Sequence, residues 1–213
     1  MTDPTVHIVD DDASFLAATA RLVRASGFAV KTFSSASDFL AQRDADVPGC
    51  VLADLQMPGM NGLDLQSALA RTRDPLPILF LTGHGDIPSS VRAMRRGAVD
   101  FLEKCAPKEK LLHALQRALA RDARARNARA WQRGLSARFD TLTEREFEVL
   151  AHVVQGKLNK QIAADLGIHE RTVKLHRTAI TTKLGVHSVA ELTRLTLEAG
   201  IFTAVASTFP KGQ

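Results

Sequence analysis

The stretch Cys50-Val51-Leu52-Ala53-Asp54-Leu55-Gln56-Met57-Pro58-Gly59 places one acidic residue directly after a short apolar run. A run of this length is typical of a buried strand in a parallel sheet, and the Pro-Gly pair after it indicates a turn. In open α/β sheets, ligands bind in the crevice beyond the carboxyl ends of the strands. Asp54 is therefore the first candidate for a functional side chain.

Three further apolar runs end in residues with chemically active side chains, and adjacent strands of one parallel sheet would bring those residues together. Residues 6–9 are followed by Asp10, Asp11 and Asp12. Residues 78–81 are followed by Thr82, and residues 99–102 are followed two positions later by Lys104. Clustered carboxylates beside one hydroxyl and one ammonium group suit Mg²⁺-assisted transfer of a phosphoryl group to a carboxylate.

The first half of the chain alternates strand patterns with helix patterns. Apolar runs predict strands near residues 5–9, 28–33, 50–53, 77–82 and 99–102. Gly27 and Gly97 stand where the intervening helices are expected to end. This alternation predicts an α/β domain at residues 1–120, with a doubly wound parallel sheet of five strands.

A helix pattern begins after Pro107 and continues into an arginine-rich stretch at residues 121–130. That stretch lacks proline and glycine and is rich in helix-forming residues. Gly134 is its first natural break. We expect residues 121–140 to form a largely helical linker.

Four helix patterns follow in residues 141–203, and residues 204–213 form a tail without a clear pattern. Two of the helices are short and are joined by a tight turn at Gly167, which predicts a helix-turn-helix. The second domain is therefore expected to be all-α.

Several polar residues are placed to cap helices. Thr143 and Glu146 have the spacing of a capping box. Asp12, Asn159 and Ser188 each precede a helix pattern and are expected to accept a hydrogen bond from its first turn.

Charge is divided unevenly between the two halves. Residues 1–120 carry 13 basic and 14 acidic residues, whereas residues 121–213 carry 15 and 9. A positive excess confined to the second half suggests that only this half meets a polyanion, although a solvated basic surface would have the same composition.

The longest apolar stretches have the length of strands, so no segment is expected to span a membrane. The amino terminus lacks a basic segment followed by an apolar one, so no signal peptide is expected. Cys50 and Cys105 are therefore expected to be reduced thiols, in a cytoplasmic protein.

The first domain resembles the receiver domain of two-component response regulators. The matching residues are Asp10, Asp11, Asp54, Thr82 and Lys104, with Met57-Pro58-Gly59-Met60-Asn61-Gly62 after the acceptor. The segments 82–86 and 97–101 resemble the FixJ-like subgroup. The resemblance implies a flavodoxin-like fold.

The second domain resembles the LuxR-type helix-turn-helix. The matching residues are Leu142-Thr143, Arg145-Glu146, Gly156, Asn159-Lys160-Gln161-Ile162-Ala163, Thr172-Val173-Lys174, His176 and Lys183-Leu184-Gly185. Together the resemblances imply a transcriptional regulator controlled by phosphorylation, and not an enzyme that turns over an external substrate. They imply a sensor histidine kinase, double-stranded DNA and RNA polymerase as partners.

By the receiver pattern, Asp54 is the phosphoacceptor, and its carboxylate attacks the phosphorus of a phosphohistidine. Mg²⁺ is the implied cofactor. Asp11, Asp54 and the backbone carbonyl of Gln56 would bind it directly, and Asp10 would act through a water molecule.

The same pattern implies that Lys104 and Thr82 contact phosphoryl oxygens. Phe101 would swing with Thr82 when the phosphoryl group arrives, although it is also expected to be a core residue. Gln56 and His84 lie two residues beyond Asp54 and Thr82, where the family tunes the attack of water. For His84, a solvated loop residue is the alternative.

The third helix of the second domain, near residues 170–184, would enter the major groove of DNA. Contacts to phosphate supply affinity, and contacts to base edges supply specificity. The candidate contact residues are Lys160, Arg171, Thr172, Lys174, His176 and Arg177. Val173 and Ile180 are expected in the core, and His169 is a poor cap for this helix.

Two other functions fit parts of the sequence. A hydrolase of the haloacid dehalogenase kind would need an acid two residues after the nucleophile, where Gln56 cannot shuttle a proton. A DNA-binding regulator with a degenerate, phosphorylation-independent receiver remains open, because Lys104 is followed by Cys105.

Receivers usually carry a proline after the active-site lysine, with a cis peptide bond between the two residues. A cis bond before a residue other than proline costs roughly 2.5–4 kcal/mol. We therefore expect a trans bond between Lys104 and Cys105, which would alter the path by which Lys104 reaches a phosphoryl oxygen. A strained cis bond held by the surrounding fold is the alternative.

The family also implies a homodimer that forms on phosphorylation, through the fourth helix, fifth strand and fifth helix of the receiver. A solvated charged face is the alternative for this segment. Its charged residues include Arg92, Arg95, Arg96, Asp100, Glu103 and Glu109.

Overall fold

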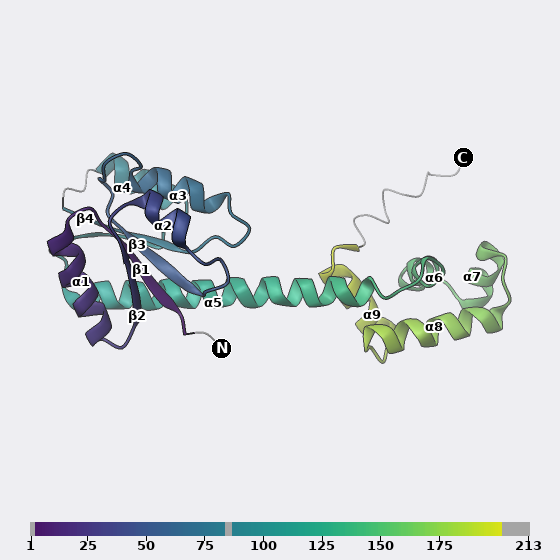
Figure 1. Cartoon of the computed structure of the whole chain (residues 1–213). Coiled ribbons are helices and arrows are strands. Elements are labelled where there is room, and N and C mark those ends of the chain that lie inside the picture. The colour runs from purple at the N-terminus through teal and green to yellow at the C-terminus, as the bar shows by residue number, and fades with distance from the viewer. Residues whose placement is uncertain (1–2, 84–86, 202–213) are drawn as a thin grey trace. The chain divides into compact units, whose positions relative to one another are not determined.

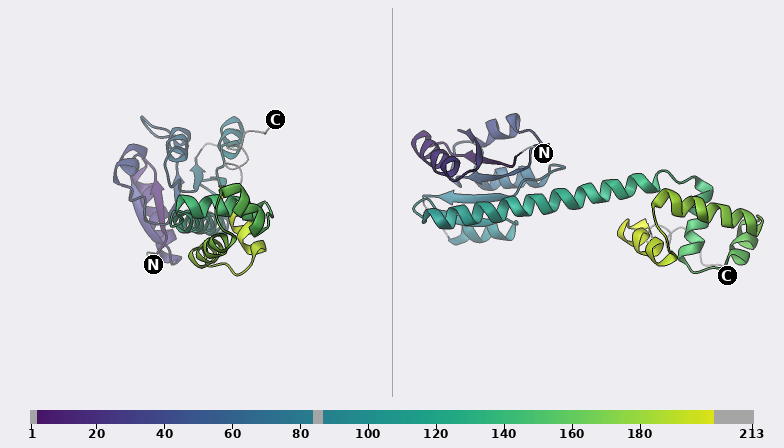
Figure 2. Two further views of the ribbon diagram at one scale, coloured as in Figure 1. Left: turned by 90° about the vertical axis from the view of Figure 1, so that its right-hand side faces the viewer. Right: turned by 90° about the horizontal axis from the view of Figure 1, so that it is seen from below.

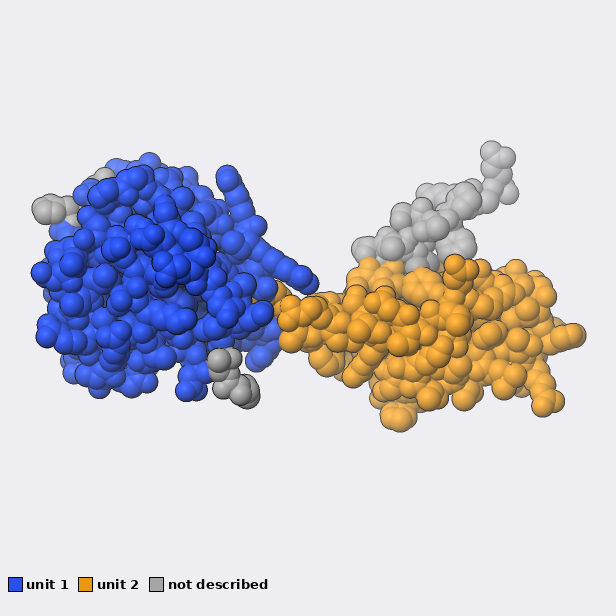
Figure 3. Space-filling view, viewed as in Figure 1, with its two compact units in different colours: residues 1–127 blue, residues 128–213 orange. Residues whose placement is uncertain are grey.

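The structure is a computed structural model that describes residues 3–83 and 87–201. The chain divides into two compact units, residues 1–127 and residues 128–213, which Figure 3 shows in different colours. Within the described residues, no helix is both long enough and apolar enough to cross a membrane.

The first unit is built on a five-stranded parallel sheet with the order β2-β1-β3-β4-β5 (Figure 1). The strands are β1 (Thr5–Val9), β2 (Ala29–Phe33), β3 (Gly49–Ala53), β4 (Ile78–Thr82) and β5 (Asp100–Glu103). Every residue of β1, β3 and β4 is buried, as expected for strands that are covered on both faces. The predicted fold class is confirmed.

Helices cover both faces of the sheet (Figure 2). One face packs against α1 (Ala13–Ala25) and the first part of α5 (Lys108–Phe139). The other packs against α2 (Ala36–Gln42), α3 (Gly62–Ala70) and α4 (Ile87–Arg95). Asp12 caps α1 as predicted, because its side chain accepts hydrogen bonds from the backbone N–H groups of Ser14 and Phe15.

Helix α5 has no break at Gly134, so that expectation was wrong. Its middle part is fixed to the first unit by the buried Asp122, whose Oδ2 accepts hydrogen bonds from the backbone N–H of Gly49 and from Arg126 Nε, both at 2.9 Å. Its end belongs to the second unit, because Leu135 and Phe139 are buried in the core there.

Up to residue 201, the second unit adds four helices, α6 (Glu144–Val154), α7 (Asn159–Leu166), α8 (Glu170–Leu184) and α9 (Val189–Glu198). The capping box of Thr143 and Glu146 and the cap by Ser188 are both present as predicted. The turns after α7 and α8 use Gly167 and Gly185 with positive φ of 63° and 66°, which favours glycine.

The predicted cap by Asn159 was wrong. Asn159 is the first residue of α7, and its Oδ1 instead accepts a hydrogen bond from Arg177 Nη1 at 2.8 Å. The start of α7 is satisfied by Gln161, whose side chain accepts from the backbone N–H of Leu158 at 2.9 Å. His169 precedes α8 without a side-chain capping bond, as expected for a poor cap.

Candidate functional site

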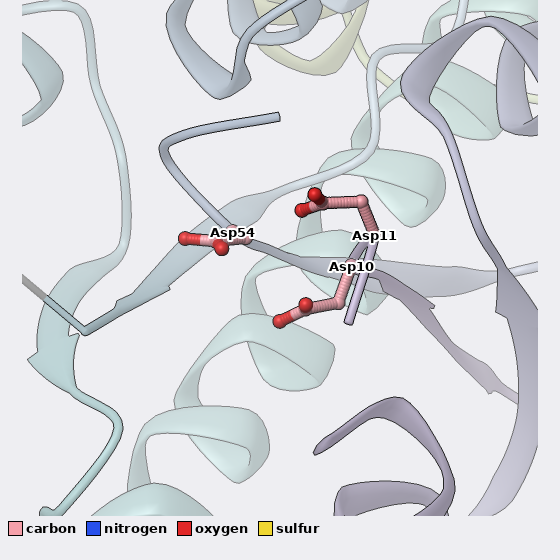
Figure 4. A group of neighbouring side chains, drawn as sticks. All are labelled: Asp10, Asp11 and Asp54. Carbon is pink, nitrogen blue, oxygen red and sulfur yellow. The ribbon is translucent and has the colours of Figure 1, made fainter. Parts of the chain in front are cut away.

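Three acidic side chains gather beyond the carboxyl ends of β1 and β3. Asp10 and Asp11 directly follow β1, and Asp54 directly follows β3, its neighbour in the sheet. One oxygen from each carboxylate lies within 4.8 Å of the other two, and Figure 4 shows the three groups together. Asp10 and Asp54 are buried and Asp11 is exposed. Three carboxylate oxygens around one space are a donor set that suits a small divalent cation.

The Asp54 carboxylate is held by the loop that follows it. Its Oδ1 accepts a hydrogen bond from the backbone N–H of Leu55 at 2.6 Å. The N–H of Gly62 donates to the carbonyl of Leu55 at 3.0 Å, which closes the loop onto the start of α3. A Cβ at position 62 would lie 2.5 Å from the carbonyl oxygen of Asp54 and 2.8 Å from the Phe80 ring. Glycine is therefore required for α3 to begin this close to the acceptor strand.

The Lys104 ammonium lies between two of the acids. Its Nζ is 2.7 Å from Asp10 Oδ2 and 3.0 Å from Asp54 Oδ2. Burial alone would lower the pKa of Lys104, but the bonds to Asp10 and Asp54 hold that pKa above its usual value. Burial raises the pKa of the Asp10 carboxyl, and the bond to Lys104 offsets only part of this effect. The lysine thus stays charged and partly neutralises the acid cluster.

The peptide bond between Lys104 and Cys105 is trans, as predicted, since no cis peptide bond occurs among the described residues. The backbone N–H of Lys104 donates to the carbonyl of Thr82 at 2.8 Å, so pairing of β4 with β5 fixes where the lysine begins. The Nζ atom reaches both acids along this trans path. The altered residue after the lysine therefore leaves the ion pairs in place.

The remaining predicted receiver residues have different degrees of exposure. Thr82 is buried at the end of β4, whereas Gln56 is exposed beside Asp54. Phe101 is half-buried in β5 and packs against the core, with its ring centroid 6.1 Å from that of Phe80. His84 lies outside the described residues, so its suggested role stays a prediction.

Helix α8 presents one face to solvent and packs the other against its unit. Val173 and Ile180 are buried in the core, as predicted. Near its end, Lys183 Nζ donates to Glu146 Oε2 at 2.6 Å, and this bond holds the pKa of Glu146 below its usual value. With the bond from Arg177 to Asn159, this contact fixes α8 against α6 and α7.

The exposed residues of α8 agree only in part with the residues that were predicted to contact DNA. Arg171, Leu175 and Thr178 are exposed and follow one another at helical spacing, and Lys174 is exposed beside them. Thr172, His176 and Arg177 are only half-exposed, and Lys160 is exposed on α7. Leu175 and Thr178 were absent from the predicted set, although the helical period from Arg171 would have identified both.

These features define a class of protein. An open α/β sheet carries clustered acids, a hydroxyl and an ammonium group at the carboxyl ends of its strands. In a separate unit, the second helix of the helix-turn-helix, α8, has a positively charged face that is exposed to solvent. The chain therefore carries a carboxylate site that suits a divalent cation in one unit and a helix-turn-helix in the other.

Comparison with known proteins identifies the family. Residues 6–116 match the family described as "Response regulator receiver domain", and residues 140–196 match "Bacterial regulatory proteins, luxR family". The chain belongs to the response regulators that join these two domains. It is a two-component transcriptional regulator with a receiver domain and a DNA-binding domain, and not a catalytic enzyme.

Individual relatives cover nearly the whole chain. The transcriptional regulatory protein FixJ of Rhizobium meliloti is 41% identical over 204 residues, which cover 94% of this chain and 98% of FixJ. The response regulator protein TodT of Pseudomonas putida is 42% identical over 191 residues, 90% of this chain and 84% of TodT. A solved structure of the response regulator StyR is 46% identical, with a TM-score of 0.86, and the match covers 92% of this chain and 100% of that one.

Proposed function

We propose that Asp54 is the phosphoacceptor of this regulator. Its carboxylate would attack the phosphorus of a phosphohistidine on the kinase, the P–N bond would break, and the imidazole nitrogen would leave with the electron pair. The observation that carries the proposal is the place of Asp54 at the end of β3, beside Asp10, Asp11 and Lys104. Transfer from acetyl phosphate, followed by intact mass, tests the assignment directly.

The acid cluster is the proposed Mg²⁺ site. Asp11, Asp54 and the carbonyl of Gln56 would hold the ion, with Asp10 acting through water, and the bound ion would neutralise charge that otherwise repels a phosphoryl group. The donor set is consistent with this ion, since carboxylate oxygens are the ligands Mg²⁺ prefers.

The other receiver residues are proposed to respond to the phosphoryl group once it is bound. Lys104 would exchange its contact with Asp54 Oδ2 for one with a phosphoryl oxygen, and the Thr82 hydroxyl would donate to another. Phe101 would then repack towards Thr82. The bonds from Lys104 to both acids support a receiver that can be phosphorylated, because they place a charged ammonium beside the acceptor carboxylate.

We further propose that the exposed face of α8 reads DNA in the major groove. Arg171 and Lys174 carry the positive charge there, and Leu175 is suited to an apolar contact with thymine methyl groups. Lys160 and Thr172 flank this face, and His176 and Arg177 would contact the DNA backbone from the half-exposed side.

Replacing Arg171 with Ala is expected to weaken specific DNA binding by about 1–3 kcal/mol and to relax the sequence preference at one position, as for the loss of a base contact. Lys174→Ala should weaken binding to all sequences and reduce the salt slope by about 1. Binding by fluorescence anisotropy over a salt series measures both effects. Arg133→Ala removes the same charge from an exposed site off α8 and is the matched control. If both α8 variants bind DNA with wild-type affinity, α8 is not the helix that contacts the DNA.

Dimerisation on phosphorylation is proposed to use α4, β5 and the start of α5. Ile87, Val91 and Met94 leave large apolar side chains exposed on α4, and Ile87 is 79% exposed. A pocket of about 700 Å³ lies beside them and is lined by Phe101. The charged residues of this face partly pair within the chain, since Arg117 binds Asp100. The apolar residues therefore supply the stronger argument for an interface.

Beryllofluoride, which mimics the phosphoryl group, is expected to convert the protein from monomer to dimer. Met94→Glu should prevent this conversion, because it would bury an unpaired charge in the interface. Light scattering measures the mass of each species. Ala17→Glu, which adds the same charge on the exposed side of α1, should dimerise like the unmodified protein. An unchanged monomer mass in the unmodified protein would contradict the proposal.

The partners follow from the two domains. The receiver implies a histidine kinase partner, and the LuxR-type domain implies binding to DNA. We propose that the protein acts in the cytoplasm, where it would meet both, and that it also contacts RNA polymerase when bound upstream of a gene.

A further inference from the structure

The Lys104 ammonium has an aromatic neighbour in addition to its two acidic partners. Its Nζ lies 4.3 Å from the centroid of the Phe15 ring, within the range of a cation–π contact. We propose that Phe15 is a positioning residue that keeps the Lys104 ammonium directed at the acceptor carboxylate. The inference rests on the proposed role of Asp54 and Lys104, and it adds the residue that holds the lysine in place.

The turn that carries the acids also fixes the backbone at Phe15. Asp10 Oδ1 accepts a hydrogen bond from the backbone N–H of Asp12 at 2.9 Å, and Asp12 Oδ1 accepts one from the N–H of Phe15 at 3.1 Å. The half-buried ring then packs against the core beneath α1 and α5. The ring is thus held against the core of the domain. The Lys104 ammonium, by contrast, lies at the end of a flexible four-carbon stem.

The surroundings of Lys104 explain why such support is needed. The side chain is 19% exposed, so solvent contacts part of it. A Cβ built on Gly83 would lie 4.0 Å from Lys104 Cδ, so the lysine stem passes close to this glycine. Because the lysine must exchange Asp54 for a phosphoryl oxygen, Asp10 and Phe15 are the contacts that stay unchanged during transfer. Without the ring, the ammonium would spend more time turned away from the acceptor.

Replacing Phe15 with Leu keeps an apolar side chain but removes the π face. We expect phosphorylation by acetyl phosphate to become about fivefold slower, equivalent to about 1 kcal/mol. Phe15→Tyr keeps the ring and should restore a rate close to that of the unmodified protein. Phe28→Leu makes the same change at another half-buried position against the same core and should leave the rate unchanged.

Proton NMR of the unphosphorylated protein gives a readout that does not depend on activity. Protons of the Lys104 Cε group that lie over the ring should resonate upfield of ordinary lysine values. The shift should persist in Phe15→Tyr and Phe28→Leu and disappear in Phe15→Leu. Thermal unfolding of each variant checks that the domain remains folded.

The outcomes separate this inference from the assignment of Asp54. A Phe15→Leu protein with the unmodified rate would overturn the positioning role. A Phe15→Tyr protein as slow as Phe15→Leu would also overturn it, since simple packing would then account for the loss. Failure of the unmodified protein to form any adduct at Asp54 would overturn both proposals, even with the upfield shift present.

Discussion

Asp54→Asn is expected to abolish the gain of one phosphoryl group when the protein is incubated with acetyl phosphate and Mg²⁺. The amide cannot attack phosphorus as a carboxylate does, and the other two acids of the cluster, Asp10 and Asp11, follow β1 and not β3. Asp10 is engaged by Lys104 Nζ on one oxygen and by the N–H of Asp12 on the other. Intact mass spectrometry of both proteins under identical conditions measures the result.

Asp38→Asn provides a control for this experiment. Asp38 is an exposed acid in the first turn of α2, so its replacement makes the same chemical change away from the cluster. This variant should gain the phosphoryl group as the unmodified protein does. A full adduct on Asp54→Asn would show that another carboxylate is the acceptor.

A fragment that begins at residue 141 is expected to be much less stable than one that begins at residue 128. Leu135 and Phe139 are 2% and 6% exposed and pack into the core of the second unit. Burying a side chain of this size is worth about 1.5–3 kcal/mol, so the shorter fragment should lose about 3–6 kcal/mol of unfolding free energy. We therefore propose that the DNA-binding domain starts near residue 128 and not at 141.

Urea unfolding of the two fragments measures this difference. In the longer fragment, the double variant Leu135→Ala and Phe139→Ala should approach the stability of the shorter one. Trp131→Ala removes a large side chain from the same helix at a position that is 53% exposed, and it should have a small effect. Equal midpoints for the two fragments would mean that the end of α5 is dispensable.

Much of the receiver could be predicted because its elements are marked by local chemistry. Buried parallel strands are nearly continuous apolar runs, and polar residues with functional chemistry come directly after them. The five strands therefore lie within one residue of the expected positions at each end. Asp12, Thr143 and Ser188 cap their helices as expected, since a cap depends only on the next few residues.

Features that depend on tertiary contacts were harder to predict. Asn159 has the chemistry of a cap, but Arg177, 18 residues later, takes its side-chain oxygen. Gly134 interrupts no helix, because Leu135 and Phe139 are held in a core on its far side. The contact of Lys104 with Phe15 joins residues 89 positions apart, and no local pattern indicates it.

The exposed Leu175 has a consequence for how binding would respond to temperature. In the free protein, the Leu175 side chain on α8 is 64% exposed, so water is ordered around it. If this side chain is buried against thymine methyl groups, complex formation acquires a more negative heat capacity change. The enthalpy of binding would then become more favourable on warming. Sites that contain thymine would differ from other sites in affinity at one temperature. They would differ also in how strongly the binding free energy curves with temperature.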